Sequence, residues 1–66
     1  MSGIDEMKTE IKKLSAKATN MKMNLHDLSE ELPVNWKTIL TVAQETYDAY
    51  AALEAARTKL KELETA

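Results

Sequence analysis

The sequence predicts an all-α fold, an antiparallel hairpin of two helices that pairs with a second copy to form a four-helix bundle. Apolar residues recur every three or four positions through the first half of the chain. The single proline stands near the middle, and the single glycine is the third residue. Alanine, leucine, glutamate and lysine, which favour helices, are abundant, and β-branched residues form no alternating run.

The first helix is expected over about residues 4–32. Its apolar positions alternate at spacings of three and four residues for four heptads, which places them on one narrow seam. Nine residues form this predicted seam: Ile4, Met7, Ile11, Leu14, Ala18, Met21, Leu25, Leu28 and Leu32. Asp5 and Glu6 lie in the first turn, where negative charge complements the helix dipole. Residues 1–3 are expected to be a flexible lead, in which Ser2 is a candidate cap.

Pro33 ends the first helix, because a residue that precedes proline is driven out of the α region. Residues 33–38 form the connection, with room for a 3₁₀ turn, and Asn35 and Thr38 are candidate caps for the next helix. The second helix is expected over about residues 39–64. Its predicted apolar stripe is Ile39, Ala43, Tyr47, Tyr50, Leu53, Leu60 and Leu63, widened by Val42, Ala49, Ala52 and Ala56. The alanine-rich stretch 49–56 is expected to mark the closest approach of the two helices.

The length of the chain limits the core that it can form. Sixty-six residues are expected to make one domain, residues 1–66, and no cysteine is available for a disulfide. Two helices of similar length with a short connection fold back antiparallel and leave apolar positions exposed. A second hairpin would cover those positions, so a homodimer is expected for the free protein.

Composition narrows the classes of function. The net charge of −2, with both signs spread along the chain, disfavours nucleic acid as a partner. No apolar stretch approaches the roughly 20 residues of a membrane span, and no apolar signal core is visible, so a cytoplasmic protein is expected. No nucleophile accompanied by a base and no glycine-rich loop is present. No enzyme activity, no catalytic residue and no cofactor are therefore expected.

Three neighbouring residues of the first helix are candidate partner contacts. Met23 points directly away from the predicted seam, and its flexible thioether suits an apolar contact, although a lone exposed methionine is also ordinary. His26 is the only histidine and lies beside Asp27 and one turn before Glu30. This pattern could supply half of a divalent metal site. A solvated histidine is favoured because no second histidine or cysteine completes the shell, so no metal site is expected.

Three aromatic residues are further candidates. Trp36 lies in the connection, where it is expected to cover Leu32 and Leu40 at the end of the bundle, and where it would otherwise be a natural hot spot for a partner. Tyr47 and Tyr50 lie three residues apart on one face. Their rings can pack at the edge of the core while the hydroxyls reach water or a partner.

Charge changes sign along the first helix. Lys12, Lys13, Lys17 and Lys22 follow one another without an intervening acidic residue, and the acidic residues Asp27, Glu30 and Glu31 come after them. This change of sign could set the direction in which a partner docks or the register of paired helices. An ordinary solvated surface is the alternative.

The run from Ala18 to Pro33, with its Lys-Met-Asn-Leu-His-Asp-Leu core, resembles the small Rop-like proteins of bacterial nitrogen-fixation gene clusters. More narrowly, it resembles the nitrogenase-associated factor T type. Trp36 and the Tyr47–Leu53 stretch extend the resemblance over nearly the whole chain.

The resemblance implies a two-helix hairpin, often dimerised, that works in the cytoplasm beside nitrogenase. It implies no catalytic residues. The expected function is that of a non-enzymatic accessory protein. Its partner would be the nitrogenase molybdenum-iron protein or a cofactor-assembly protein, and its role would be in assembly, protection or repair. A Rop-like RNA-binding bundle that uses the lysine face is the alternative.

Overall fold

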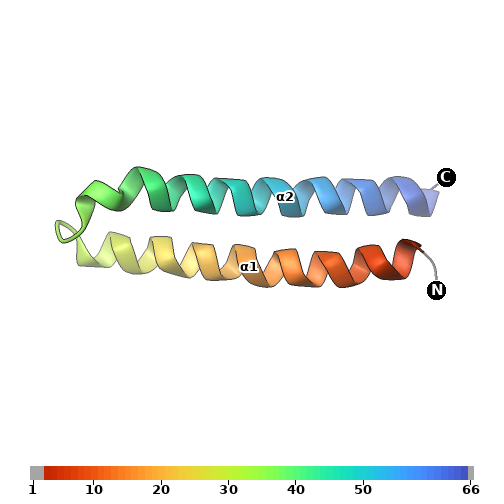
Figure 1. Ribbon diagram of the computed structural model, residues 1–66, viewed down its shortest axis with the longest axis horizontal. Helices are drawn as coiled ribbons and strands as arrows, with labels where there is room; N and C mark the ends of the chain where they lie inside the picture. Colours follow the sequence, from red (N-terminus) through yellow and green to blue (C-terminus); the bar gives the residue numbers. More distant parts are fainter. Residues whose placement is uncertain (1–2, 66) are drawn as a thin grey trace.

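The computed structural model describes residues 3–65 and is a hairpin of two long helices. Helix α1 spans Gly3–Glu31, a single 3₁₀ turn spans Trp36–Thr38, and helix α2 spans Ile39–Thr65. The two helices run antiparallel, with both chain ends at the end opposite the connection (Figure 1). Residues 3–65 contain no strand, so the predicted all-α hairpin is confirmed.

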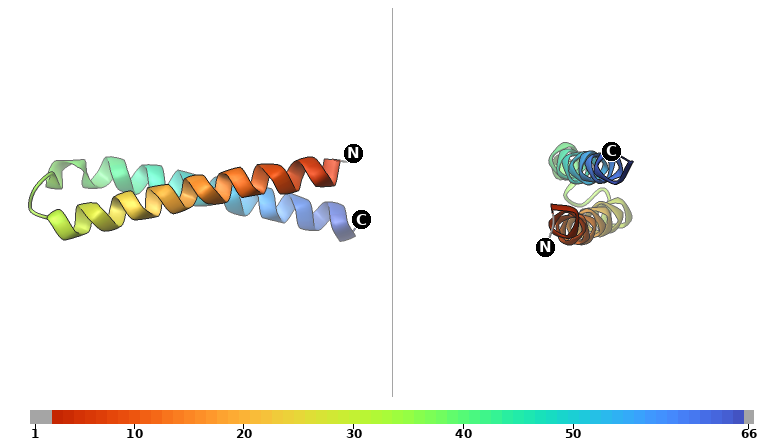
Figure 2. Two further views of the ribbon diagram at one scale, coloured as in Figure 1. Left: turned by 90° about the horizontal axis from the view of Figure 1, so that it is seen from below. Right: turned by 90° about the vertical axis from the view of Figure 1, so that its right-hand side faces the viewer.

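The predicted boundaries agree with these helices to within one residue. Gly3, which was expected in a flexible lead, instead begins α1. The rest of that lead, including the candidate cap Ser2, lies outside the described residues. The hairpin measures 49 × 15 × 12 Å, and the helices cross at a shallow angle instead of lying strictly parallel (Figure 2).

The connection is held by short-range backbone hydrogen bonds. The Val34 amide donates to the Glu31 carbonyl at 2.9 Å, and the Thr38 amide donates to the Asn35 carbonyl at 2.9 Å. Asn35 has a left-handed backbone with φ of 62°, a conformation that asparagine tolerates better than most residues. The Asn35 side chain makes no cap hydrogen bond, and the Thr38 hydroxyl donates to the Asn35 carbonyl at 2.8 Å. Asn35 therefore shapes the turn through its backbone.

The predicted seam of α1 faces α2. Eight of its nine residues are partly or fully buried, and only Leu32, which lies beyond the end of α1, is exposed. At the centre, Ala18 retains 1% of its accessible surface and packs with Ala49 at 6% and Leu53 at 5%. Small side chains at this level let the helix backbones approach closely.

The predicted stripe of α2 is partly wrong. The residues that face α1 repeat at heptad spacing, and Tyr47 and Tyr50 are not among them. This inner seam is Ile39, Val42, Thr46, Ala49, Leu53, Ala56 and Leu60, all partly or fully buried. Thr46 fits there because its hydroxyl can donate a hydrogen bond to a backbone carbonyl. Its Oγ1 lies 2.9 Å from the Val42 carbonyl oxygen and 3.2 Å from the Met21 carbonyl oxygen of the other helix. A tyrosine ring would hold the helices apart at this level.

The alanine-rich stretch confirms the expected close approach in part. Ala49 and Ala56 lie on the inner seam, whereas Ala51, Ala52 and Ala55 are exposed. The helices therefore meet along one edge of this stretch. No helix in the described part of the chain combines the length and the hydropathy of a membrane span.

Candidate functional site

The exposed large apolar side chains gather in the half of the hairpin nearest the connection. Seven of the eight such side chains among the described residues lie between positions 23 and 50, and Leu63 is the exception. The seven are Met23, Leu32, Val34, Trp36, Leu40, Tyr47 and Tyr50. A concentration of large exposed apolar side chains in one region makes that region the candidate for an interaction site.

Four of these seven side chains, together with the partly buried Ala43, form a regular row along the 3₁₀ turn and α2, outside the inner seam. We call this row the outer stripe, and it comprises Trp36, Leu40, Ala43, Tyr47 and Tyr50. Successive members are four, three, four and three residues apart, which is the spacing of neighbours on one helix face. Leu40 is 83% exposed and Tyr47 is 71% exposed. The outer stripe thus has the periodicity of a helix-packing surface, yet its four large side chains are exposed.

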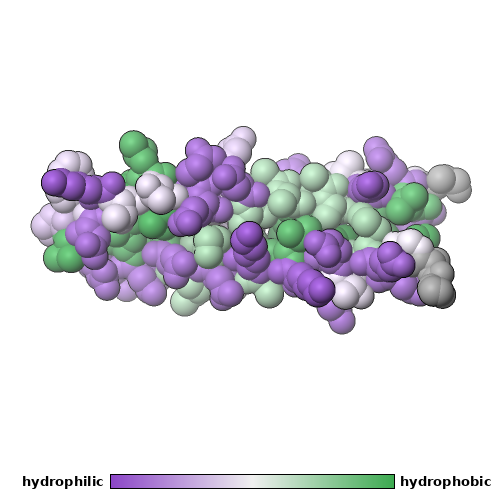
Figure 3. Space-filling view, in the orientation of Figure 1, coloured by the Kyte–Doolittle hydropathy of each residue, from purple (hydrophilic) through white to green (hydrophobic). Residues whose placement is uncertain are grey.

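The space-filling view shows apolar surface on α2 (Figure 3). Strongly apolar surface projects over the start of α2, and weakly apolar surface covers its middle, with hydrophilic side chains between and around them (Figure 3). A shallow groove of about 240 Å³ runs along this helix and is lined by Thr46, Tyr47, Tyr50, Ala51 and Glu54. The two tyrosines therefore belong to one surface.

Trp36 does not have the structural role that the sequence predicted for it. Its side chain is 59% exposed, and Leu40, which it was expected to cover, is the most exposed large apolar residue described. Val34 beside it is 60% exposed. The prediction that Trp36 covers Leu32 and Leu40 at this end of the hairpin is therefore wrong in the single chain, since all three side chains are exposed.

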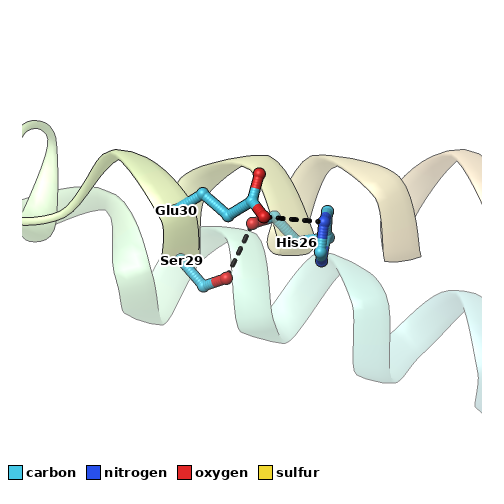
Figure 4. Close-up of polar contacts among 3 residues, drawn as sticks. All are labelled: His26, Ser29 and Glu30. Atoms are coloured by element: carbon cyan, nitrogen blue, oxygen red, sulfur yellow. Dashed lines mark hydrogen bonds and ion pairs between the residues drawn. The ribbon is translucent and has the colours of Figure 1, made fainter.

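The predicted contacts on α1 lie apart from the outer stripe. Met23 is 51% exposed and points away from the seam, and hence away from α2. His26 Nε2 lies 3.3 Å from Glu30 Oε2, with both side chains more than half exposed, and Ser29 Oγ donates to the His26 carbonyl at 2.7 Å (Figure 4). Asp27 is exposed on the same helix. These are local contacts within one helix.

The six predicted site residues therefore divide into two groups. Trp36, Tyr47 and Tyr50 share the outer stripe, and Met23, His26 and Asp27 do not. Within residues 3–65, no group of three or more histidine, cysteine, aspartate or glutamate side chains could hold a metal ion. Sequence reasoning missed Leu40 as a site residue, although its spacing from Trp36 and Tyr47 was visible.

The four lysines do not form one face. Lys12, Lys13, Lys17 and Lys22 are all exposed on α1, but at 100° per residue they spread over more than half of the helix circumference. Lys17 also lines a groove that contains Glu45 and Asp48. The expectation of a single cationic helix face is therefore wrong, which weakens the RNA alternative.

The half of the hairpin that carries the outer stripe is acidic. We call residues 20–50 the loop half. Its cations are Lys22 and Lys37, and its carboxylates are Asp27, Glu30, Glu31, Glu45 and Asp48. The loop half thus has a net charge of −3 at neutral pH with histidine uncharged. A partner that covers the outer stripe would be favoured by basic residues at its rim.

The chain is similar to known proteins in both sequence and structure. The model of the Rop-like family matches residues 2–65. A UPF0437 protein of Azorhizobium caulinodans is 69% identical over 97% of this chain and 93% of its own length. An NMR structure of a Northeast Structural Genomics Consortium target superposes with a TM-score of 0.91, is 46% identical, and covers 98% of this chain and 92% of its own.

One relative has a name that gives its genetic location. A protein of Frankia alni described as a "UPF0437 protein in nifX-nifW intergenic region" is 54% identical over 65% of this chain and 52% of its own length. The resemblance to small proteins of nitrogen-fixation clusters is thereby confirmed. The chain belongs to the Rop-like family.

Proposed function

We propose that this protein is a non-enzymatic accessory factor of nitrogen fixation that binds a larger protein through its outer stripe. The partner is a nitrogenase component, such as the molybdenum-iron protein, or a cofactor-assembly protein. The observation that supports this proposal best is the heptad-spaced outer stripe, whose most exposed residue, Leu40, is 83% exposed. The nifX-nifW location in the name of the Frankia alni relative supports a partner from nitrogen fixation.

The outer stripe has the composition of an energetic hot spot. Tryptophan and tyrosine dominate binding energy in protein interfaces, because each covers a large area at a low cost in side-chain entropy. Burying a leucine fully stabilises a complex by about 1.5–3 kcal/mol. Leu40 and Tyr47, the two most exposed members, would therefore contribute most to binding.

The structure also suggests how a small factor distinguishes its partner. The loop half carries −3, so a partner surface that pairs an apolar groove with a basic rim is favoured over an acidic one. Such a factor holds an immature or damaged state of its partner by covering apolar surface, and this action requires no chemistry of its own. Assembly, protection and repair of the partner would each use this covering of apolar surface.

Affinity capture from nitrogen-fixing and non-fixing cultures tests the proposal. The tagged full-length chain is compared with Leu40→Glu and with Ala55→Glu, a control at an exposed alanine of α2 outside the outer stripe. The wild type and Ala55→Glu should recover a nitrogenase or assembly protein from fixing cells, and Leu40→Glu should lose it. Equal recovery by both variants, or no such protein with the wild type, would overturn the proposal.

A further inference from the structure

The connection between the helices forms a second exposed apolar surface, at one end of the hairpin. We call residues 30–36 the hairpin tip, and every one of them is exposed. Leu32, Val34 and Trp36 are each more than 40% exposed. Strongly apolar surface appears at this end of the molecule, on the left in the space-filling view (Figure 3). Trp36 also belongs to the outer stripe, but Leu32 and Val34 do not, so a partner on the outer stripe leaves them without a role.

The hairpin tip is also rich in hydrogen-bond acceptors. Glu30 and Glu31 give it a net charge of −2, and it contains no cation. Pro33 has no amide hydrogen to donate to the Ser29 carbonyl. The Val34 amide donates to the Glu31 carbonyl and not to that of Glu30. The carbonyls of Ser29 and Glu30 therefore lack the donor, four residues later, that a continuing helix would supply.

The two carboxylates lie where they weaken the helix that carries them. The C-terminal end of a helix is the negative end of its dipole, so cations stabilise this end and anions do not. The last turn of α1 contains no basic residue. Within residues 3–65, Glu30 pairs only with His26, and Glu31 has no ion-pair partner. The hairpin tip thus presents negative charge that no described lysine or arginine neutralises.

We propose that the hairpin tip is a docking surface for a segment of a partner protein in which an arginine stands beside large apolar side chains. A guanidinium has five N–H donors and a planar face, which suit the Glu31 carboxylate, the carbonyls that end α1 and the exposed indole of Trp36. The neighbouring apolar side chains cover Leu32 and Val34. Lysine fits less well, because its ammonium has three donors and is more strongly hydrated. This proposal goes beyond the proposed function, since it assigns a second surface and requires no nitrogenase client.

NMR titration of the full-length chain with two short peptides tests the proposal. The probe is acetyl-Leu-Arg-Leu amide, and its matched control carries citrulline, the uncharged isostere of arginine, at the middle position. Backbone amide shifts should move at residues 29–37. The arginine peptide should bind at least about five-fold more tightly than the citrulline peptide. Shift changes centred elsewhere, equal affinities, or no saturable change would overturn the proposal.

Two charge-matched variants separate a specific contact from the overall charge. Glu31→Gln and Glu62→Gln each remove one negative charge from an exposed side chain, but Glu62 lies near the opposite end of the hairpin. Glu31→Gln should reduce the preference for arginine over citrulline by at least about two-fold, and Glu62→Gln should keep it. Val34→Ser should weaken both peptides, because it removes apolar contact area. An equal preference in the two glutamine variants would refute the assigned contact.

The fluorescence of Trp36 gives an independent measurement, because it is the only tryptophan. Its emission should shift to shorter wavelength with the arginine peptide and stay unchanged with phosphatidylcholine vesicles. A shift with the vesicles and none with the peptide would assign the hairpin tip to a lipid surface and overturn the proposal. Client capture is scored separately. A chain that binds the arginine peptide but captures no client refutes only the proposed function, and the reverse outcome refutes only this proposal.

Discussion

Leu53→Ala is the substitution expected to destabilise the hairpin most clearly. Leu53 is 5% exposed and is the largest residue in the central cluster, where it packs with Ala18 and Ala49. Replacing a buried leucine by alanine costs about 2–5 kcal/mol, through lost transfer energy and the cavity that remains. A domain of this length has roughly 3–10 kcal/mol of stability in total. The variant should therefore lose a substantial share of its free energy of unfolding, and its urea midpoint should fall clearly.

Urea denaturation followed by circular dichroism measures this effect, with Leu40→Ala as the matched control. Both substitutions remove the same atoms, but Leu40 is 83% exposed in the single chain. At a protein concentration low enough to keep the chain monomeric, Leu40→Ala should change the free energy of unfolding by less than about 0.5 kcal/mol. Equal destabilisation by the two variants would show that the assignment of inner seam and outer stripe is wrong.

Three further predictions concern the helix contact and the surface. Ala49→Leu should cost about 1–3 kcal/mol, because a larger side chain at the closest approach forces the helices apart, and an unchanged urea midpoint would contradict this close packing. Thr46→Val should cost no more than about 1 kcal/mol in the same assay, since the hydroxyl is a donor whose removal leaves no buried group without a partner; a larger loss would mean that the bond to Met21 sets the register. His26→Ala should alter stability by less than about 0.5 kcal/mol, because its exposed pair with Glu30 is screened by water, and a larger drop in melting temperature would refute this assignment.

The fold was predictable because the apolar residues of α1 follow a single, regular spacing. The seam from Ile4 to Leu28 alternates strictly, and each of its members is at least partly buried. Pro33 fixed the end of the first helix for a steric reason that does not depend on the partner helix. The bounds of the first helix followed from these two features.

The face of α2 that meets α1 was harder to predict because that helix carries two sets of apolar positions. One set contains small or polar residues such as Thr46 and Ala49, and the other contains the larger Tyr47 and Tyr50. Sequence reasoning favoured the larger side chains, but the close approach at Ala18 leaves room only for the smaller ones. Because the smaller residues face α1, Tyr47 and Tyr50 lie on the exposed outer stripe. The periodicity of α2 alone could not show which of its two apolar sets would be exposed.

The candidate site was predictable in its residue types but not in its grouping. Trp36, Tyr47 and Tyr50 were each recognised as potential partner contacts, and the structure adds Leu40 and Ala43 between them. The spread of the four lysines followed directly from helix geometry. It was missed because closeness in sequence was taken for closeness on the surface.

Site-specific photocross-linking in nitrogen-fixing cells tests the central claim most directly. A benzophenone amino acid replaces Tyr47 in one strain and Ala55 in a control strain, and adducts are identified by mass spectrometry. The account predicts an adduct between position 47 and a nitrogenase or assembly protein, with little or none from position 55. An adduct that forms equally from both positions, or only from position 55, would contradict the assignment of the outer stripe as the docking surface.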